Sequence, residues 1–293
     1  MVQVKECPVC NSGNLKEELI VKDYTVSNEY FSIVKCPSCN FLITSPRPET
    51  NDLEKYYQSD DYVSHKDNAS GVINELYQIA RKFTLHWKHD LVNKRIRDIE
   101  PNILDIGCGT GSFLAYMKQK GYVVEGVEPS DEARQHAESK LDQSIYHTIS
   151  DVKGTYACIT LWHVLEHLPT LNESLSQIKS LLNNNGMILI AVPNFESFDA
   201  RKYEGHWAAY DVPRHLWHFS QSSMNKLATK HGLKIIQTIP MKLDSFYVSM
   251  LSEKYQGKNG FMRMISGAVT GLRSNINSGK ANQYSSLVYL ITK

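Results

Sequence analysis

The stretch Leu104-Asp-Ile-Gly-Cys-Gly-Thr-Gly-Ser-Phe113 decides the fold of this 293-residue chain. A short apolar run precedes the glycines, and a helical pattern over 111–120 follows them. Glycine at every second position from 107 to 111 allows a tight turn and a close approach of a ligand to the backbone. The unpaired amides at the start of the helix would face that ligand. The sequence therefore predicts a strand, a ligand-binding loop and a helix.

The segments after this loop repeat the alternation of strand and helix. Strand-like runs recur at 123–127, 157–161 and 187–192, with helical patterns between them, and further strands are expected at 233–239 and 286–292. Such alternation is typical of a doubly wound parallel sheet. We therefore expect an α/β, Rossmann-like domain over 101–293 with a mostly parallel seven-stranded sheet, interrupted by an insertion at 241–284.

The second of these strands ends in Val127-Glu-Pro-Ser130, which places a carboxylate at the edge of the sheet. Glu128 lies 21 residues after Gly107, where it can accept hydrogen bonds from both hydroxyls of a ribose. An NAD fingerprint would require a third glycine at position 112, where this chain has Ser112. The spacing therefore disfavours a dinucleotide.

These motifs resemble those of the class I S-adenosylmethionine-dependent methyltransferases over residues 101–239. The segment 104–113 is similar to the first motif of that family, 123–130 to the second, and Ile159-Thr-Leu-Trp-His-Val-Leu-Glu-His-Leu168 to the motif after the fourth strand. The resemblance implies methyl transfer from S-adenosylmethionine. It also implies a set of cofactor-binding residues: Asp105, Gly107, Cys108, Gly109, Gly111, Glu128, Pro129, Leu161 and Trp162, with Asp151 as the candidate acid for the adenine amine.

Two matching cysteine pairs lie near the N-terminus. They read Cys7-Pro-Val-Cys10-Asn and Cys36-Pro-Ser-Cys39-Asn, separated by 25 residues. Two such turns supply the four thiolates that Zn²⁺ binds in a tetrahedron, and four thiolates leave no open position for catalysis. Asn11 and Asn40 suit the left-handed conformation that ends such a turn. Residues 1–48 are therefore predicted to form a small ribbon around a structural zinc ion.

Residues 49–100 are expected to form a helical linker or lid. Within it, the segment 56–65 resembles the lid of zinc-ribbon methyltransferases, which makes Tyr62 and His65 candidates for cofactor contact. Ribbon, lid and core together resemble, over residues 5–239, the sugar C-methyltransferases that act on nucleotide-linked deoxysugars. We therefore expect the acceptor to be a small or lipid-linked anionic molecule, and the resemblance implies a sugar nucleotide as one candidate.

The loop 205–220 concentrates aromatic, histidine and charged side chains between two strands. Such a loop is where an acceptor would be held. The base candidates are His215, Asp211 and His163, the last at the end of the fourth strand of the core. Candidates for acceptor binding are Tyr210, Arg214 and Trp207. An alternative interpretation is that the aromatic residues only pack the loop and that Asp211 pairs with Arg214.

The charge distribution bears on the partners. The formal net charge is +1, and residues 1–50 carry five basic and six acidic residues, so the ribbon offers no basic track for RNA. Residues 241–293 carry seven basic and two acidic residues. The insertion at 241–284 could therefore cover an anionic acceptor or make weak contact with anionic lipids.

The start of the chain has no apolar stretch of signal-peptide length, and we expect a cytoplasmic protein.

Two other functions stay open from the sequence alone. One is a zinc-finger RNA methyltransferase, and the other is a catalytically idle module that keeps the cofactor-binding fold.

Overall fold

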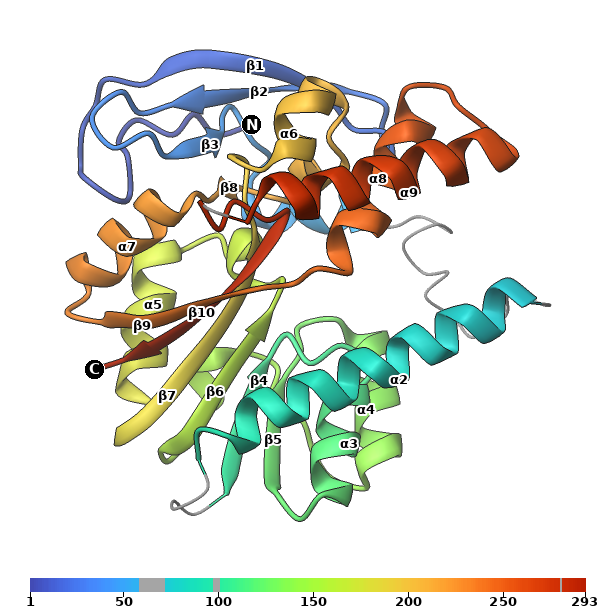
Figure 1. The fold of residues 1–293 in the computed structure, drawn as a ribbon. Helices are drawn as coiled ribbons and strands as arrows, with labels where there is room; N and C mark the ends of the chain where they lie inside the picture. Colours follow the sequence, from blue (N-terminus) through green and yellow to red (C-terminus); the bar gives the residue numbers. More distant parts are fainter. Residues whose placement is uncertain (58–71, 97–100, 280) are drawn as a thin grey trace.

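Two sheets organise the chain (Figure 1). The computed structural model describes residues 1–57, 72–96, 101–279 and 281–293, with the backbone alone for 72–81. The larger sheet has the strand order β5-β4-β6-β7-β10-β9. Its strands are β4 (Asn102–Ile106), β5 (Val123–Val127), β6 (Tyr156–Trp162), β7 (Leu182–Pro193), β9 (Lys234–Pro240) and β10 (Ser286–Thr292).

The larger sheet is mostly parallel, as the sequence predicts. Strands β5, β4, β6 and β7 run parallel, whereas β10 is antiparallel to both β7 and β9. Six strands pair within the described ranges, where seven were expected. Beside β5, the seventh position is reduced to one parallel bridge between Val127 and Tyr146, because the segment before β6 is too short for a full strand.

Helices cover both faces of this sheet. Helices α5 and α7 pack on one face, against residues such as Ile159 and Ile190, while α2, α3 and α4 pack on the other, against residues such as Cys158 and Leu189. Successive strand residues point to opposite faces, so unbroken apolar strands suit a sheet that is buried on both sides. The helices are α2 (Val72–Asn93), α3 (Ser112–Gln119), α4 (Asp131–Leu141), α5 (Leu171–Ser180) and α7 (Gln221–Lys230).

The smaller sheet joins the ribbon to the catalytic half of the chain. Its order is β1-β2-β3-β8, and all three pairings are antiparallel. The strands are β1 (Lys16–Lys22), β2 (Tyr30–Lys35), β3 (Leu42–Thr44) and β8 (Trp217–His218). Strand β8 belongs to the loop 205–220, so the candidate acceptor loop is hydrogen-bonded to the ribbon. The sequence did not predict this pairing, which joins residues more than 170 positions apart.

The insertion forms a helical hairpin, where the sequence predicted no defined structure. Helices α8 (Asp244–Tyr255) and α9 (Gly260–Asn277) lie side by side beyond the edge of the smaller sheet (Figure 1). A further helix, α6 (Phe198–Tyr203), packs against both of them. None of the helices in the described ranges is both long and apolar enough to cross a lipid bilayer.

Short 3₁₀ turns complete the structure. The helical linker expected over residues 49–100 begins with a 3₁₀ segment, η1, as far as Tyr57, and residues 58–71 lie outside the described residues. The 3₁₀ turns are η1 (Thr50–Tyr57), η2 (Ile149–Asp151), η3 (Leu165–His167), η4 (Glu204–His206) and η5 (Ala208–Tyr210).

Candidate functional site

The glycine loop lies at the carboxyl end of β4, between β5 and β6. Its three glycines, Gly107, Gly109 and Gly111, all have positive φ angles of 69°, 54° and 71°. A Cβ atom on Gly107 would lie 2.5 Å from a methyl carbon of Val164, whereas a Cβ on Gly109 would meet no atom within 4 Å. Gly107 therefore permits close packing, and Gly109 faces open space. The chain reverses direction across the sheet between β4 and β6, which is where ligands bind in open α/β sheets.

Glu128 connects the loop to the end of β5. Its Oε2 atom accepts a hydrogen bond from the amide of Gly109 at 2.8 Å, and its Oε1 atom accepts one from the amide of Ser130 at 2.9 Å. Each carboxylate oxygen has two lone pairs, so each keeps one for a further donor. The carboxylate is thus fixed in place and can still accept two hydroxyl groups. Pro129 lies between Glu128 and Ser130 in the segment that joins β5 to α4.

Asp105 is buried in β4 beneath the same loop. Thr160 donates a hydrogen bond of 2.6 Å from its Oγ1 atom to Asp105, and burial raises the pKa of this carboxyl to about 7. The ammonium group of Lys88, from α2, is near enough to oppose that rise. Burial in turn lowers the pKa of Lys88 to about 8. Cys108 and Leu161 are buried beside them.

Trp162 ends β6 and forms one side of this region. The Lys88 ammonium lies 4.3 Å from the centre of its ring, and the Phe113 ring meets it edge to face at 5.6 Å. The indole Nε1 atom of Trp162 is buried and has no hydrogen-bond partner in the described part of the chain. An unpaired buried donor is costly, so this atom is suited to a ligand that accepts a hydrogen bond.

His163 follows Trp162 with a φ of 59° and binds two carboxylates. Its Nε2 atom lies 2.9 Å from Asp244 of α8, and its Nδ1 atom lies 3.4 Å from Glu166. Burial alone would lower the pKa of His163, but the two carboxylates outweigh it and raise the pKa to about 10. The charged imidazolium is favoured, so His163 in this arrangement is a proton donor and a poor base at neutral pH.

Glu166 is fully buried and forms an ion pair with His163, and neither of its oxygens has a further hydrogen-bond partner among the described residues. It clusters with His167 and His215, with one ligand-type atom of each within 4.8 Å of the others. The His215 Nδ1 atom donates to the carbonyl of Ala209 at 2.8 Å, which leaves its Nε2 lone pair unused by any described hydrogen bond. The imidazole of His215 therefore has the tautomer that a general base requires.

Asp211 and Arg214 are already paired. Arg214 is buried, and its guanidinium donates to both oxygens of Asp211, to Asp23 and to the carbonyl of Tyr56. Burial would raise the pKa of Asp211, but the charge and hydrogen bonds of Arg214 outweigh it and hold that pKa below its usual range. The pairing of Asp211 with Arg214 agrees with the alternative interpretation of the loop, in which these two residues bind each other. Acceptor binding by Arg214 stays a prediction, and it would require the guanidinium to exchange partners.

The remaining predicted residues lie in several environments. Trp207 and Tyr210 are buried and pack edge to face at 5.0 Å, and the indole nitrogen of Trp207 donates to Asp199. Asp151 is exposed and closes a capping box with Thr148. Tyr62 and His65 lie outside the described residues. The roles proposed for these residues stay predictions.

Three residues of the site were not among the predicted site residues: Lys88, Glu166 and Asp244. Glu166 follows His163 by one helical turn, and this spacing was the one signal for it in the sequence. Lys88 and Asp244 come from segments at least 70 positions away from Trp162 and His163 along the chain. No local pattern could have revealed those contacts.

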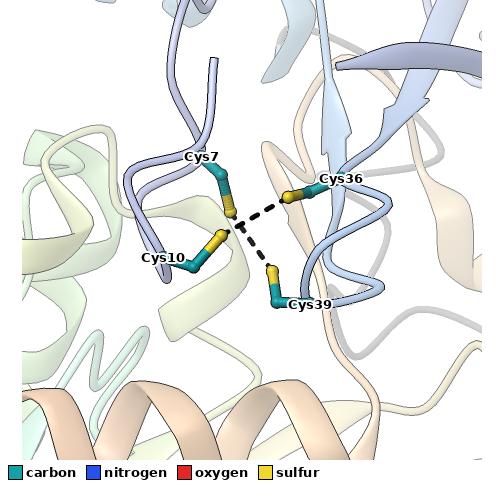
Figure 2. A group of neighbouring side chains, drawn as sticks. All are labelled: Cys7, Cys10, Cys36 and Cys39. Atoms are coloured by element: carbon teal, nitrogen blue, oxygen red, sulfur yellow. Dashed lines mark hydrogen bonds between the residues drawn. The ribbon is translucent and has the colours of Figure 1, made fainter. Parts of the chain in front are cut away.

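The four paired cysteines meet at one point (Figure 2). The Sγ atoms of Cys7 and Cys39 lie 3.4 Å apart, and those of Cys10 and Cys36 lie 3.5 Å apart. Zn–S bonds of about 2.3 Å in a tetrahedron place sulfur atoms about 3.8 Å apart, so the set fits a zinc ion after slight expansion. Asn11 and Asn40 adopt positive φ angles of 59° and 62°, which confirms the predicted turn conformation.

The fold and the loop geometry together define a class of protein. It is an α/β fold of the kind that binds nucleotides, with a glycine-rich loop where the strand order reverses between β4 and β6. The family model described as a methyltransferase domain matches residues 75–238, more than half of the chain. The chain therefore belongs to the methyltransferase domain family.

Curated relatives and solved structures agree with this membership. An uncharacterized methyltransferase of Alkaliphilus oremlandii is 33% identical over 137 residues, which cover 44% of this chain and 62% of that protein. A ubiquinone biosynthesis O-methyltransferase of Glaesserella parasuis is 33% identical over 107 residues, or 31% of this chain and 45% of that protein. The chain thus spans less than two thirds of either relative.

The fold is similar to that of magnesium protoporphyrin IX methyltransferase from Synechocystis with bound SAH, with a TM-score of 0.53 and 14% identity over 84% of this chain and 100% of that chain. It is also similar to the plantazolicin methyltransferase in complex with SAH, with a TM-score of 0.51 and 18% identity over 82% and 93% of the two chains. At such identities the likeness concerns the fold.

Proposed function

We propose that this protein transfers a methyl group from S-adenosylmethionine to a small or lipid-linked anionic acceptor. The observation that carries the proposal is the arrangement of Gly107, Gly109 and Glu128 at the switch point of the sheet. The backbone is open at Gly109, and Glu128 keeps one lone pair on each oxygen. The ribose hydroxyls of the cofactor would bind there, and Asp105 and Lys88 would face its charged methionine end.

S-adenosylmethionine supplies an electrophilic methyl group on a sulfonium, which an acceptor displaces in line. The chain must therefore align the acceptor, exclude water and, for a hydroxyl or an acidic C–H acceptor, remove a proton. His215 is the base that the geometry favours, because His163 is held protonated and Asp211 is neutralised by Arg214. Glu166 beside His215 would stabilise the imidazolium that forms.

The cysteine cluster is proposed to hold one structural zinc ion. All four thiols are available as ligands. Burial raises the pKa of Cys7 to about 11, whereas at Cys36 hydrogen bonds from Cys10 and from backbone amides outweigh burial and lower the pKa to about 7. A bound cation would favour the thiolate form of all four. With four sulfur ligands the ion has no open position for a substrate. Its role would be to fix the ribbon, and through β3 to fix β8 and the loop that carries His215.

A small acceptor is favoured over RNA. The ribbon carries a slight excess of acidic residues, so it offers no basic surface to which a polyanion such as RNA would bind. The relative from Glaesserella parasuis is named for O-methylation in ubiquinone biosynthesis, which is small-molecule chemistry. A sugar nucleotide suits the resemblance to sugar methyltransferases, and a zinc-finger RNA methyltransferase or an idle cofactor-binding module would be the competing outcomes.

Calorimetric titration of the full chain tests the cofactor assignment. We expect one binding site for S-adenosylmethionine or SAH and no competition from NAD. Binding of NAD, or no binding of either sulfur compound to folded protein, would contradict the proposal.

A further inference from the structure

Helix α9 presents large apolar side chains to solvent. Seven of them are exposed, with Phe261 at 74% and Ile276 at 68% of their full accessible surface. Most are spaced three or four residues apart and so share one face of the helix. The seven are Phe261, Met262, Met264, Ile265, Val269, Leu272 and Ile276. Soluble proteins rarely concentrate apolar residues on an exposed face without a partner.

The buried face of α9 carries small residues. Gly267, Thr270, Gly271 and Ser274 are buried, and the helix packs closely on α8. A Cβ atom on Gly267 would lie 2.7 Å from the Cα of Met250, and one on Gly271 would lie 2.8 Å from the Cα of Phe246. Small residues at a spacing of four let helix backbones approach closely, as they do between helices in lipid. In the hairpin, small residues lie between the helices and large apolar side chains face solvent. A pair of helices in a soluble protein has the opposite arrangement.

The exposed charges of the hairpin are positive. Lys242, Lys254, Lys258 and Arg273 are exposed. Its acidic residues instead face the protein: Asp244 pairs with His163, and the buried Glu253 accepts hydrogen bonds from Tyr203 and Ser266. Glu253 also forms an ion pair with Lys258 at 2.5 Å, so the cations that would face a lipid surface are Lys242, Lys254 and Arg273. An apolar face flanked by cations matches the interface of a bilayer that contains anionic lipid.

We propose that the α8–α9 hairpin docks this protein onto the surface of an anionic lipid bilayer. The apolar face of α9 would enter the boundary between headgroups and acyl chains, and the flanking lysines and Arg273 would contact lipid phosphates. With one apolar face and cations beside it, the hairpin would lie in the membrane plane. A second copy of the chain fits less well, since a two-fold contact would set the same basic patch against itself.

Docking would bring the candidate site to the membrane. Asp244 opens α8 and holds His163, so the hairpin and the end of β6 are directly joined. A lipid-linked acceptor would then reach the site without leaving the bilayer. Membrane binding does not rest on the proposed methyl transfer, and it is measured without turnover.

Flotation of the full chain with vesicles tests the docking proposal. The vesicles would contain either phosphatidylcholine alone or phosphatidylcholine mixed with phosphatidylglycerol. We expect binding to the mixed vesicles that weakens in high salt, and much weaker binding to phosphatidylcholine alone. Replacing Phe261 and Ile265 together by Ser should weaken vesicle binding roughly tenfold or more, since each change removes apolar area from the lipid contact. Replacing Lys242 and Arg273 by Gln should weaken binding to the mixed vesicles alone.

The matched control replaces two exposed apolar residues outside the hairpin, Ile20 and Val123, by Ser. This control should bind vesicles like the unmodified chain. Because all of these positions are exposed, the variants should unfold at similar temperatures, which calorimetry checks. No flotation by the unmodified chain, or equal binding to both vesicle types, would overturn the proposal. A dimer that Phe261→Ser/Ile265→Ser dissociates, without vesicle binding, would instead identify a second copy as the partner.

Discussion

Glu128 is the residue on which cofactor affinity should depend most. Each charge-assisted hydrogen bond to a carboxylate contributes about 1.5–3 kcal/mol, so Glu128→Ala should weaken S-adenosylmethionine binding by tens-fold or more. Calorimetry measures this directly. The control is Asp131→Ala, which removes a neighbouring surface carboxylate that pairs with Arg134. Equal affinity of the Glu128 variant and the unmodified chain would show that the ribose does not bind there.

His215 should act on turnover and leave cofactor binding unchanged. If its Nε2 atom removes the acceptor proton, His215→Ala should lower kcat by roughly 10²–10⁴ while the affinity for S-adenosylmethionine stays nearly constant. His231→Ala, at the end of α7, is the control. Since His215 also supports the loop through Ala209, partial rescue of the variant by added imidazole would separate a base from a structural role. A variant with full activity would exclude His215 as the base.

At the residue scale, the sequence predicted the groups that follow strand ends. Gly107 and Glu128 could be placed because each lies directly after an apolar run, and parallel strands end at one edge of the sheet. The electrostatic state of the candidate bases could not be predicted. His163 becomes protonated through Asp244, which is 81 positions away, and Arg214 is shared with Asp23 of the ribbon.

At the element scale, the proposed zinc site should control the ribbon and the loop that pairs with it. Cys36→Ser should remove zinc and speed amide hydrogen exchange in β1, β2, β3 and, through the β3–β8 pairing, in the segment 215–219. The larger sheet should stay protected, because it has its own apolar interior. Elemental analysis and exchange measured by mass spectrometry provide the test. A full zinc content after the substitution would refute the ligand assignment.

The close contact between α8 and α9 should tolerate no larger residue at its centre. Gly267→Val would force a side chain against the Met250 backbone, and overpacking of this kind costs about 1–3 kcal/mol. We expect a lower unfolding temperature by calorimetry. Ala268→Val, at the exposed neighbouring position, should change stability little. Equal stability of the two variants would show that the helices do not pack as described.

The hairpin also shows where element prediction from sequence fails. The strands and helices of the larger sheet follow the usual rule that apolar residues face the core, so their alternation is visible in the sequence. In α9 the rule is reversed, since Gly267, Gly271 and Ser274 face the protein and Phe261 and Leu272 face outward. A segment rich in Gly, Ser, Met and Lys therefore suggested no defined element.

At the scale of the whole molecule, the ribbon and the larger sheet share one apolar cluster. Cys7, Cys36 and Phe41 of the ribbon pack in the same cluster as Leu175 of α5 and Leu227 of α7. Pro8 also accepts hydrogen bonds from Asn172 and Lys230. The sequence predicted the ribbon and the core as separate units, because nothing local to either segment records this contact. The ribbon thus supports the loop that carries the candidate base.

The central claim is methyl transfer to a small or lipid-linked acceptor. The most direct measurement incubates the full chain with methyl-tritiated S-adenosylmethionine and a panel of nucleotide sugars, lipid-linked sugars, small anionic metabolites and bulk RNA. We predict that label enters a small or lipid-linked anionic acceptor, with little transfer by Glu128→Ala and none to RNA. Label in RNA alone would contradict the acceptor class, and a chain that binds the cofactor but labels nothing in the panel would contradict catalysis itself.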